Sequence, residues 1–330
     1  MIADPAAGTA GFLLSAHAYI ISAFGQLLDP DQKSHLRLDA LRGTELVHGV
    51  ARLAAMNLLL HGVGPLTGEE GDSPITRGDS LAARGGVRYD VVLTNPPFGK
   101  KSSVLVVNEE GEQEREALQI VRDDFIATTS NKQLNFVQHV KNILKINGRA
   151  AVVVPDNVLF EGGAGETIRR DLLKTCDVHT LLRLPTGIFY AQGVKANVLF
   201  FDARVGGDTP WTRKLWIYDL RTNKHFTLKT KQLARADLDE FVACFNTANR
   251  EDRAESWSVA NPHGRWRMYT YDQLVARDKA NLDIFWLRDE SLDDAASLEA
   301  PDLIAADIIE DLQTALDEIS LIYADLADKS

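Results

Sequence analysis

Several features that would define a protein class are scarce or missing in this 330-residue sequence. It contains only two cysteines, Cys176 and Cys244, with no Cys-x-x-Cys pair and no nearby histidine cluster. We therefore expect neither a metal site nor a disulfide framework, and we interpret both thiols as small buried groups in a reducing compartment. No apolar run approaches the roughly 20 residues that a membrane-spanning helix needs. The opening residues 1–14 lack the basic head of a signal peptide, so we expect a cytoplasmic protein without membrane contact.

The net charge of −11 is concentrated at one end of the sequence. Residues 281–330 contain fourteen Asp or Glu residues against Arg288 and Lys329, a net charge of −12. Residues 1–280 then carry a net charge of +1. Because like charges repel at close range, we expect the acidic tail to avoid polyanions, whatever the rest of the chain binds.

Residues 1–205 alternate helix-like stretches with short apolar runs. The clearest expected strands are 91–94, 149–154, 179–183 and 197–201, and residues 135–144 have apolar residues at helical spacing before a helix stop at Asn147-Gly148. This alternation predicts an α/β fold with a doubly wound, mostly parallel Rossmann-like sheet. We expect a core over residues 1–205, a β-rich extension over 206–285 that contains a hairpin, and an acidic helical tail over 286–330.

Residues 211–235 combine two β-like runs with seven basic residues and a single acid. A solvated hairpin is the simpler interpretation of this segment. A nucleic-acid-binding face is the alternative.

The stretch Asp4-Pro-Ala-Ala-Gly-Thr-Ala-Gly-Phe-Leu13 precedes a helix-like segment and is rich in glycine. Glycines between a strand end and a helix start let the backbone approach a ligand closely. The spacing is not Gly-x-Gly-x-x-Gly, so a dinucleotide is not the expected ligand. Asp4 can accept from an ammonium group, which suits an amino-acid moiety better than a phosphate. The alternative is a turn that serves packing alone.

Two further acids follow expected strand ends. Glu45 precedes the helix-like residues 51–60, and its carboxylate can accept from both hydroxyls of a ribose. Asp79 lies in the turn 77–81, where its oxygens can accept from an exocyclic amine. A solvated glutamate and an Asx turn or helix cap are the respective alternatives.

The last of these motifs is Asn95-Pro-Pro-Phe98, which directly follows a short apolar strand. With the glycine-rich loop and the two acids before it, this order resembles the S-adenosylmethionine-dependent amino methyltransferases. The detailed sequence of these motifs resembles the modification (M) subunit of type I restriction–modification systems, an N6-adenine DNA methyltransferase. The stretches 148–160, 184–189, 193–201 and 276–283 carry the same resemblance, which therefore covers most of the chain.

The chemistry of adenine methylation explains the Asn-Pro-Pro-Phe pattern. The lone pair of the adenine amine is delocalised into the ring, so the amine is a poor nucleophile. The side-chain oxygen of Asn95 and the carbonyl of Pro96 can each accept one amine hydrogen and aim the lone pair at the methyl group. Pro96 and Pro97 stiffen the loop, and Phe98 offers a flat surface on which a flipped base can stack.

The resemblance also implies roles for the other positions. Gly8, Thr9, Ala10 and Gly11 would line the methionine part of S-adenosylmethionine, and Glu45 would hold the ribose. Asp79 would hold the adenine amine of the cofactor. The remaining candidate cofactor-binding residues are Asp4, Ala6, Phe12, Ser80 and Phe136.

Two aromatic side chains have competing interpretations. Phe136 matches a position that packs on the cofactor's adenine, but it also fits the apolar face of its own helix. Phe189 is a candidate second wall for the flipped base.

The implied partners are DNA, a specificity (S) subunit, a restriction (R) subunit in the full complex and a second M subunit. Residues 301–327 favour a partner-docking helix, because Pro301 suits a first helical position and apolar residues then recur every three or four positions. The alternative is a helix folded onto the chain's own core.

The resemblance has one gap, because Met1 lies only three residues before Asp4. The family carries a helical domain before this point, so we expect an N-terminally truncated subunit. Two other functions stay open. One is an amino methyltransferase acting on RNA or protein glutamine, and the other is an inactive scaffold subunit.

Overall fold

The computed structural model describes residues 1–66, 69, 71–98, 119–189, 194–224, 226–228 and 230–289, together with the backbone of 103–107 and 113–117. The chain divides into two units, residues 1–287 and 288–330. The sheet, its helices and the candidate site belong to the first unit. The helix expected over residues 301–327 lies outside the described residues.

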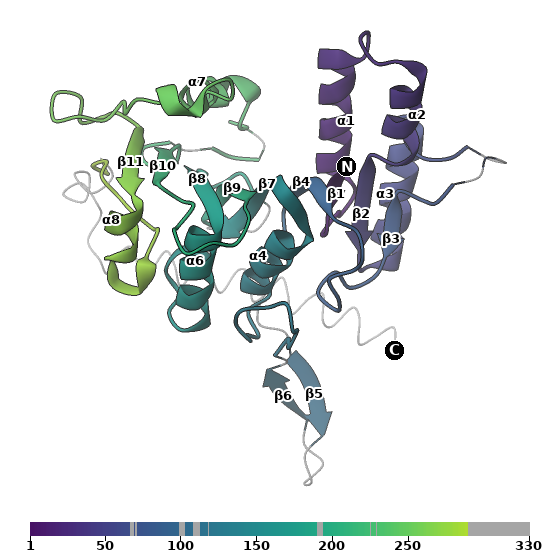
Figure 1. Ribbon diagram of the computed structural model, residues 1–330, viewed down its shortest axis with the longest axis horizontal. Helices are drawn as coiled ribbons and strands as arrows, with labels where there is room; N and C mark the ends of the chain where they lie inside the picture. The colour runs from purple at the N-terminus through teal and green to yellow at the C-terminus, as the bar shows by residue number, and fades with distance from the viewer. Residues whose placement is uncertain are drawn as a thin grey trace, which may run out of the picture. The chain divides into compact units, whose positions relative to one another are not determined.

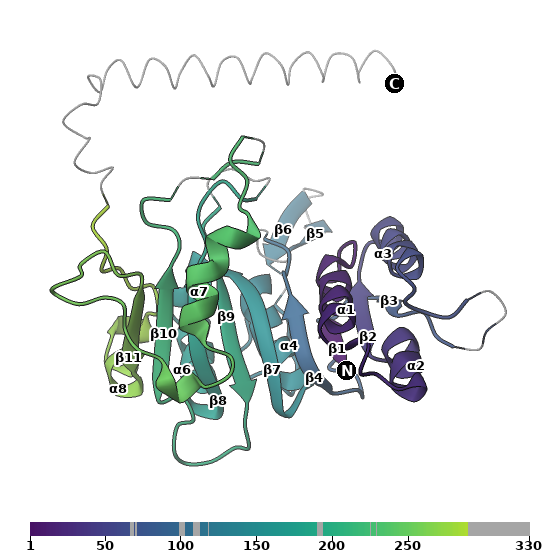
Figure 2. The ribbon, with the colours of Figure 1, turned by 90° about the horizontal axis from the view of Figure 1, so that it is seen from above.

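The first unit is built on a nine-stranded sheet with the order β11-β10-β8-β9-β7-β4-β1-β2-β3, which Figure 2 shows from one edge to the other. Its strands are β1 (Ile2–Asp4), β2 (Leu41–Glu45), β3 (Ile75–Arg77), β4 (Tyr89–Thr94), β7 (Leu144–Pro155), β8 (Cys176–Arg183), β9 (Ala196–Ala203), β10 (Lys214–Asp219) and β11 (Trp266–Thr270). Only β9 and β11 pair antiparallel with their neighbours in this sheet. The predicted α/β class with a mostly parallel Rossmann-like sheet is confirmed.

Helices cover both faces of this sheet. They are α1 (Gly11–Phe24), α2 (Pro30–Leu38), α3 (His48–Leu60), α4 (Lys132–Ile143), α5 (Asp156–Phe160), α6 (Ala164–Thr175), α7 (Asp239–Phe245) and α8 (Tyr271–Val275), with short 3₁₀ turns at Arg235–Leu238, Arg250–Asp252 and Asp278–Ala280. In Figure 1, α1, α3 and α7 lie on one side of the sheet, and α4 and α6 lie on the other. Val152 and Val153 of β7 accordingly contribute to separate apolar clusters on opposite faces.

The end of α4 differs from the expectation. The helix stops at Ile143, and β7 begins at Leu144, so Asn147-Gly148 is not a helix stop but lies inside the strand. Asn147 has φ +63°, and the pairing register with β4 shifts across this stretch. A Cβ on Gly148 would lie 2.9 Å from the Tyr89 carbonyl oxygen, so the close approach of β4 explains the glycine.

The expected solvated hairpin within residues 211–235 is wrong. Its first run is β10, which is buried beyond its first residue and pairs with β8 and β11. Residues 220–224, 226–228 and 230–234 of the second run form no strand. A separate antiparallel pair does occur elsewhere, formed by β5 (Ser103–Val107) and β6 (Gln113–Ala117).

Both cysteines are free thiols. Cys176 is buried, as expected, and burial raises its pKa to about 11. Cys244 is only partly buried. Within the described ranges, no helix is both long and apolar enough to cross a bilayer.

Candidate active site

The sequence-predicted site residues meet at one edge of the sheet. The parallel strands β1, β2, β3 and β4 are neighbours, so their carboxyl ends point the same way. Asp4 and Glu45 end β1 and β2, Asp79 follows β3, and Asn95 follows β4. Ligands of open α/β sheets bind outside these carboxyl ends, so the edge is the expected place for a site.

The glycine-rich loop leaves open backbone at the start of α1. Gly8 has φ +53° and Ala10 has φ +69°, and no side chain caps the helix that begins at Gly11. A Cβ added at Gly8 or Gly11 would meet nothing within 4 Å. The loop therefore offers free space beside a helix N-terminus, where backbone N–H groups favour an anionic or electron-rich ligand.

Residues of β2 and α3 hold the glycine-rich loop in place by hydrogen bonds. The side chain of Asn57 on α3 donates to the Thr9 carbonyl oxygen at 3.0 Å. Ala6 is partly buried, Ala7 donates its N–H to the Thr44 carbonyl, and Phe12 on α1 is partly exposed. The loop is thus attached to both β2 and α3.

Glu45 is oriented by backbone donors. Its Oε2 accepts from the Gly8 N–H at 3.0 Å, and its Oε1 accepts from the Val47 N–H at 2.9 Å. Each carboxylate oxygen has two lone pairs, so both can still accept a further hydrogen bond. The contact with Gly8 ties the acid to the glycine-rich loop, which brings together two residues that are 37 positions apart.

Asp79 and Ser80 are also held in place by backbone contacts. Oδ1 of Asp79 accepts from the Leu81 N–H at 2.9 Å, which is the Asx turn anticipated as the alternative. The Ser80 hydroxyl donates to the Pro5 carbonyl oxygen at 2.5 Å. The turn therefore orients the Asp79 carboxylate and still leaves its second oxygen without a hydrogen bond to a described residue.

A cavity of about 330 Å³ lies beside this turn. Asp4, Thr44, Thr76, Asp79, Tyr89 and His139 are among its lining residues. Burial and the charge of Arg122 lower the pKa of His139 to about 4, so its imidazole is neutral at neutral pH and accepts from Arg122. The volume lies at the lower end of the range for small-molecule sites.

Asp4 is more deeply buried than a direct ligand for an ammonium group would be. It is 2% exposed, and its Oδ1 accepts from the Ala6 N–H at 3.0 Å and from the Thr94 hydroxyl at 2.7 Å. Burial raises the pKa of the carboxyl to about 6, although both hydrogen bonds act in the opposite direction. Asp4 thereby links the glycine-rich loop to the residue that precedes Asn95.

Hydrogen bonds fix the Asn95-Pro96-Pro97-Phe98 loop both before and after the exposed side-chain amide of Asn95. Thr94 anchors its start, and the Gln133 side chain on α4 donates to the Pro97 carbonyl oxygen at 3.2 Å. Pro96 is buried, whereas the Asn95 side chain is exposed and has no hydrogen bond to another described residue. An amide that is free on a fixed backbone can act on a substrate without first breaking a protein contact.

Phe98 and Phe189 meet at the same edge. Their ring centroids are 5.5 Å apart with an interplanar angle of 71°, an edge-to-face contact. Phe98 follows β4 and Phe189 follows β8. The strands β7 and β9 lie between these two strands in the sheet, so the contact joins distant parts of the edge. Phe136 lies on α4 and is 7% exposed, outside the three apolar core clusters of the described residues.

Sequence reasoning missed Thr94, Gln133 and Asn57. Each acts through a partner that is distant in the chain, so no local pattern identified it. For Thr94, the position directly before Asn95 was the available signal.

Comparisons with known proteins identify the family of this chain. The family model described as N-6 DNA Methylase matches residues 1–265. The chain is 39% identical to the type I restriction enzyme StySPI methylase subunit of Salmonella potsdam and to the EcoKI methylase subunit of Escherichia coli (strain K12), in each case over 99% of this chain and 64% of the relative. The crystal structure of the EcoKI M protein matches with a TM-score of 0.72 and 37% identity, over 99% of this chain and 68% of that one. The chain therefore spans about two thirds of the length of these curated relatives.

Proposed function

This chain belongs to the N-6 DNA methylase family, and on that premise we propose that it methylates the N6 amine of adenine in DNA as the modification subunit of a type I restriction–modification complex. The observation that carries the proposal is the exposed Asn95 amide on a loop fixed by Thr94 and Gln133, one strand away from the glycine-rich loop. We assign methyl transfer to residues 1–205, with 206–285 as an extension and 286–330 as a docking tail.

The residues present fit S-adenosylmethionine, which supplies an electrophilic methyl group when bound. The free space at Gly8 and Gly11 accommodates the methionine part, next to Thr9 and Ala10. Glu45 keeps acceptor capacity for the ribose hydroxyls. The second oxygen of Asp79 accepts from the adenine amine, beside a cavity of about 330 Å³.

The remaining candidates support these contacts. Asp4, Ala6 and Ser80 hold the loop and the turn in position, as their hydrogen bonds indicate. Phe12 and Phe136 provide apolar surface for the cofactor. In this assignment Asp4 acts through the backbone and Thr94 rather than by touching the ligand's ammonium group.

The methyl-transfer step then depends on positioning. The Asn95 oxygen and the Pro96 carbonyl accept the two hydrogens of the adenine amine, and the lone pair points at the methyl group. The target base stacks on Phe98. If Phe189 forms the second wall, the rings must separate from 5.5 Å to roughly 7 Å, two stacking distances, to admit a base.

The proposed partners are DNA, the S subunit, a second M subunit and the R subunit of the full complex. Both curated relatives are named as methylase subunits of type I restriction enzymes, which supports this assignment. The sequence of residues 301–327 suggests the docking helix for the S subunit. Charges placed at Leu312 and Ile319 should abolish co-purification with that subunit and leave the core folded; normal assembly of this variant would contradict the docking role.

The decisive experiment compares Asn95→Ala with Asn95→Asp in a methylation-competent assembly. The alanine variant should lose methyl transfer by at least about 100-fold, since it removes one acceptor in the transition state, and should keep its cofactor affinity. The aspartate variant should retain part of the activity because one oxygen remains. Wild-type rates for Asn95→Ala would refute the mechanism.

Two controls separate this proposal from its alternatives. A panel of DNA, RNA and protein substrates with a radiolabelled methyl donor tests the substrate class. Calorimetric titration with S-adenosylmethionine tests the scaffold alternative, which predicts no heat at millimolar cofactor.

A further inference from the structure

The segment after β10 is the most basic part of the catalytic edge. Residues 220–234 contain four Lys or Arg residues and no acid, in a chain whose net charge is −11. Because β10 runs parallel to β8, this segment emerges at the edge where Phe189 lies. Lys224 and Lys231 are exposed within it.

A third exposed lysine lies closer to Asn95. Lys195 precedes β9, which runs antiparallel between β7 and β8 and therefore starts at this same edge. Its carbonyl oxygen accepts from the Asp156 N–H at 3.2 Å, which places Lys195 beside the end of β7. Since β7 is the direct neighbour of β4, only one strand separates Lys195 from the strand that ends before Asn95.

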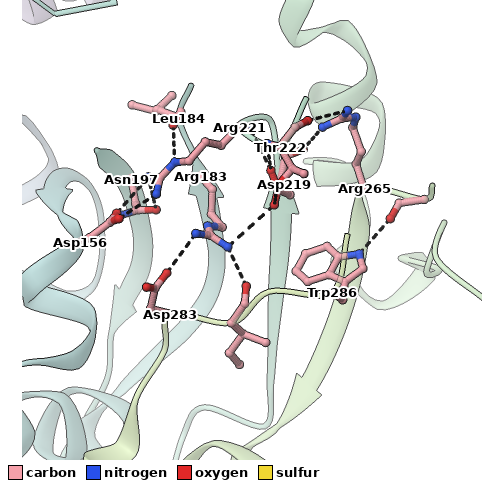
Figure 3. A network of polar contacts seen from close by, with 12 residues as sticks. Asp156, Arg183, Leu184, Asn197, Asp219, Arg221, Thr222, Arg265, Asp283 and Trp286 are labelled. Atoms are coloured by element: carbon pink, nitrogen blue, oxygen red, sulfur yellow. Dashed lines mark hydrogen bonds and ion pairs between the residues drawn. The ribbon is translucent and has the colours of Figure 1, made fainter. Parts of the chain in front are cut away.

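Three carboxylates on the β7–β10 side of this edge, those of Asp156, Asp219 and Asp283, have arginine partners, as Figure 3 shows. Arg221 binds both carboxylate oxygens of Asp156, at 2.8 and 2.9 Å. Arg183 lies 3.1 Å from Asp283 and 3.8 Å from Asp219. Each of these carboxylates therefore has an arginine partner. Lys195 also acts on the charge of Asp283, without forming an ion pair with it.

The three lysines have no ion pair with any residue in the described ranges. An acid-free loop with exposed lysines adds positive potential at this edge. The Lys231 ammonium also lies 5.6 Å from the centroid of the Phe226 ring. Phe226 in this loop lies close to the turn before Phe189, because a Cβ on Gly187, at φ +82°, would lie 1.9 Å from the Phe226 carbonyl oxygen. The basic loop therefore packs directly against the turn that carries Phe189.

We propose that Lys195, Lys224 and Lys231 form a phosphate-binding rim that holds the DNA backbone beside the flipped adenine. This inference rests on the proposed function, because it takes the substrate to be duplex DNA. The rim supplies affinity that does not depend on sequence, since ammonium groups bind phosphates without reading bases. Its contact with the Phe189 turn places the bound backbone next to the aromatic pair that receives the base.

The test compares two triple variants of the methylation-competent assembly. Lys195→Gln, Lys224→Gln and Lys231→Gln together remove the rim. The matched control, Lys174→Gln, Arg213→Gln and Lys214→Gln, removes three positive charges near the opposite edge, where α6 ends and β10 begins. Binding of a fluorescent 30-base-pair duplex is measured between about 0.05 and 0.3 M salt.

The rim variant should bind this duplex roughly 10- to 100-fold more weakly near physiological salt. Its plot of log affinity against log salt should be less steep by about 2.7, because three phosphate contacts are lost. The control should match the unmodified assembly in both quantities. Equal salt slopes for the two variants would overturn the proposal, and so would an unmodified assembly that does not bind the duplex.

Two further measurements distinguish failure of the rim from failure of the proposed function. Methyl transfer at saturating DNA should be unchanged in the rim variant, since the lysines do not touch the reacting atoms. If the unmodified assembly binds DNA through the rim but methylates nothing, the proposed function fails and the rim stands. Size-exclusion chromatography tests the competing role, because loss of the S subunit instead of DNA would make the rim a protein contact and overturn the proposal.

Discussion

The two halves of the sheet hold their functional groups by different means. On the β1–β3 side, backbone N–H groups orient Glu45 and Asp79, above a small apolar cluster of nine buried residues. On the β7–β11 side, guanidinium groups of Arg183 and Arg221 hold the buried carboxylate of Asp219 and the half-buried carboxylates of Asp156 and Asp283. The proposed cofactor is thus bound by groups that are at least partly exposed and are held by nearby backbone. The β7–β11 side, which carries Phe189 and is called the target side below, depends instead on charge pairs that are buried or half-buried. We expect substitutions to affect ligand affinity on the first side and folding stability on the second.

The largest expected effect comes from breaking the charge network on the target side. Arg183→Met leaves the buried Asp219 and the half-buried Asp283 without the Arg183 cation, which should cost about 3–5 kcal/mol of unfolding free energy. Burial already raises the pKa of Asp283 while Arg183 lowers it, so the variant should raise that pKa further. A raised pKa favours the protonated native state, so the loss should shrink as the pH falls towards that pKa.

Denaturant unfolding at several pH values measures this effect. The exposed pair Arg235–Asp239 provides the control, since Arg235→Met should change stability by less than about 1 kcal/mol. If both variants unfold like the wild type, the buried network does not set the stability of this half.

Glu45→Ala tests the cofactor side of the comparison. Because the ribose would lose a charged acceptor, S-adenosylmethionine should bind about 1.5–3 kcal/mol more weakly. Unfolding free energy should change less than in Arg183→Met, since Glu45 is only partly buried. Calorimetry measures the affinity for S-adenosylmethionine. Glu45→Gln keeps one oxygen acceptor, so its affinity should lie between those of the wild type and Glu45→Ala. An unchanged dissociation constant would show that Glu45 is merely solvated.

Thr94 on β4 links the Asn95 loop to the glycine-rich loop through Asp4, so its removal should affect both loops at once. Thr94→Val keeps the shape but removes the donor to Asp4, at a cost of about 1–2 kcal/mol. The methyl-transfer rate should fall by roughly 5- to 30-fold, with a smaller change in cofactor affinity, because Asn95 follows directly. Thr94→Ser should restore the rate. Failure of serine to do so would show that packing, not the hydrogen bond, positions Asn95.

Asp4→Asn should have the smallest effect at neutral pH, where the wild-type carboxyl is mostly ionised. In the wild type the pKa of Asp4 is raised to about 6, so protonation below that value adds a hydrogen to the carboxyl that serves Ala6 and Thr94. The cofactor affinity should therefore decline as the pH falls through about 6, and the asparagine variant should lack this dependence.

The contribution of Asp4 to the unfolding free energy of the wild type should increase as the pH falls, whereas the cofactor affinity should decrease. A raised native pKa favours the protonated folded state, so Asp4 contributes stability below about pH 4 that is lost as the pH rises through 6. Parallel titrations of affinity and unfolding measure both trends. Identical pH profiles for wild type and Asp4→Asn would show that Asp4 does not titrate in this range.

The sequence predicted the fold class and the strands near the site because these depend on local patterns. Apolar runs of four to six residues marked β4, β7, β8 and β9, and the glycines after Asp4 marked a loop before a helix. The sequence misplaced the end of α4 because Asn147-Gly148 is a common helix stop, whereas here the close approach of β4 requires a glycine in an irregular strand.

Residues 211–235 are a second case in which local sequence did not predict the structure. Composition identified residues 211–235 as unusual, but it could not decide which sheet the first run joins. Burial of β10 between β8 and β11 depends on strands that lie 31 or more residues away, so pairing and not propensity decided it.

The sequence by itself determined which chemical groups are available: an Asn-Pro-Pro-Phe loop, a glycine-rich loop and acids after successive strands. Only the tertiary structure decided which of these touch, because hydrogen bonds such as those from Thr94 to Asp4 and from Gly8 to Glu45 join residues 90 and 37 positions apart. It also showed that Asp4 is buried and Asn95 exposed. The physical reason is that parallel strands gather their carboxyl ends at one edge, and burial and charge at that edge depend on every neighbouring strand.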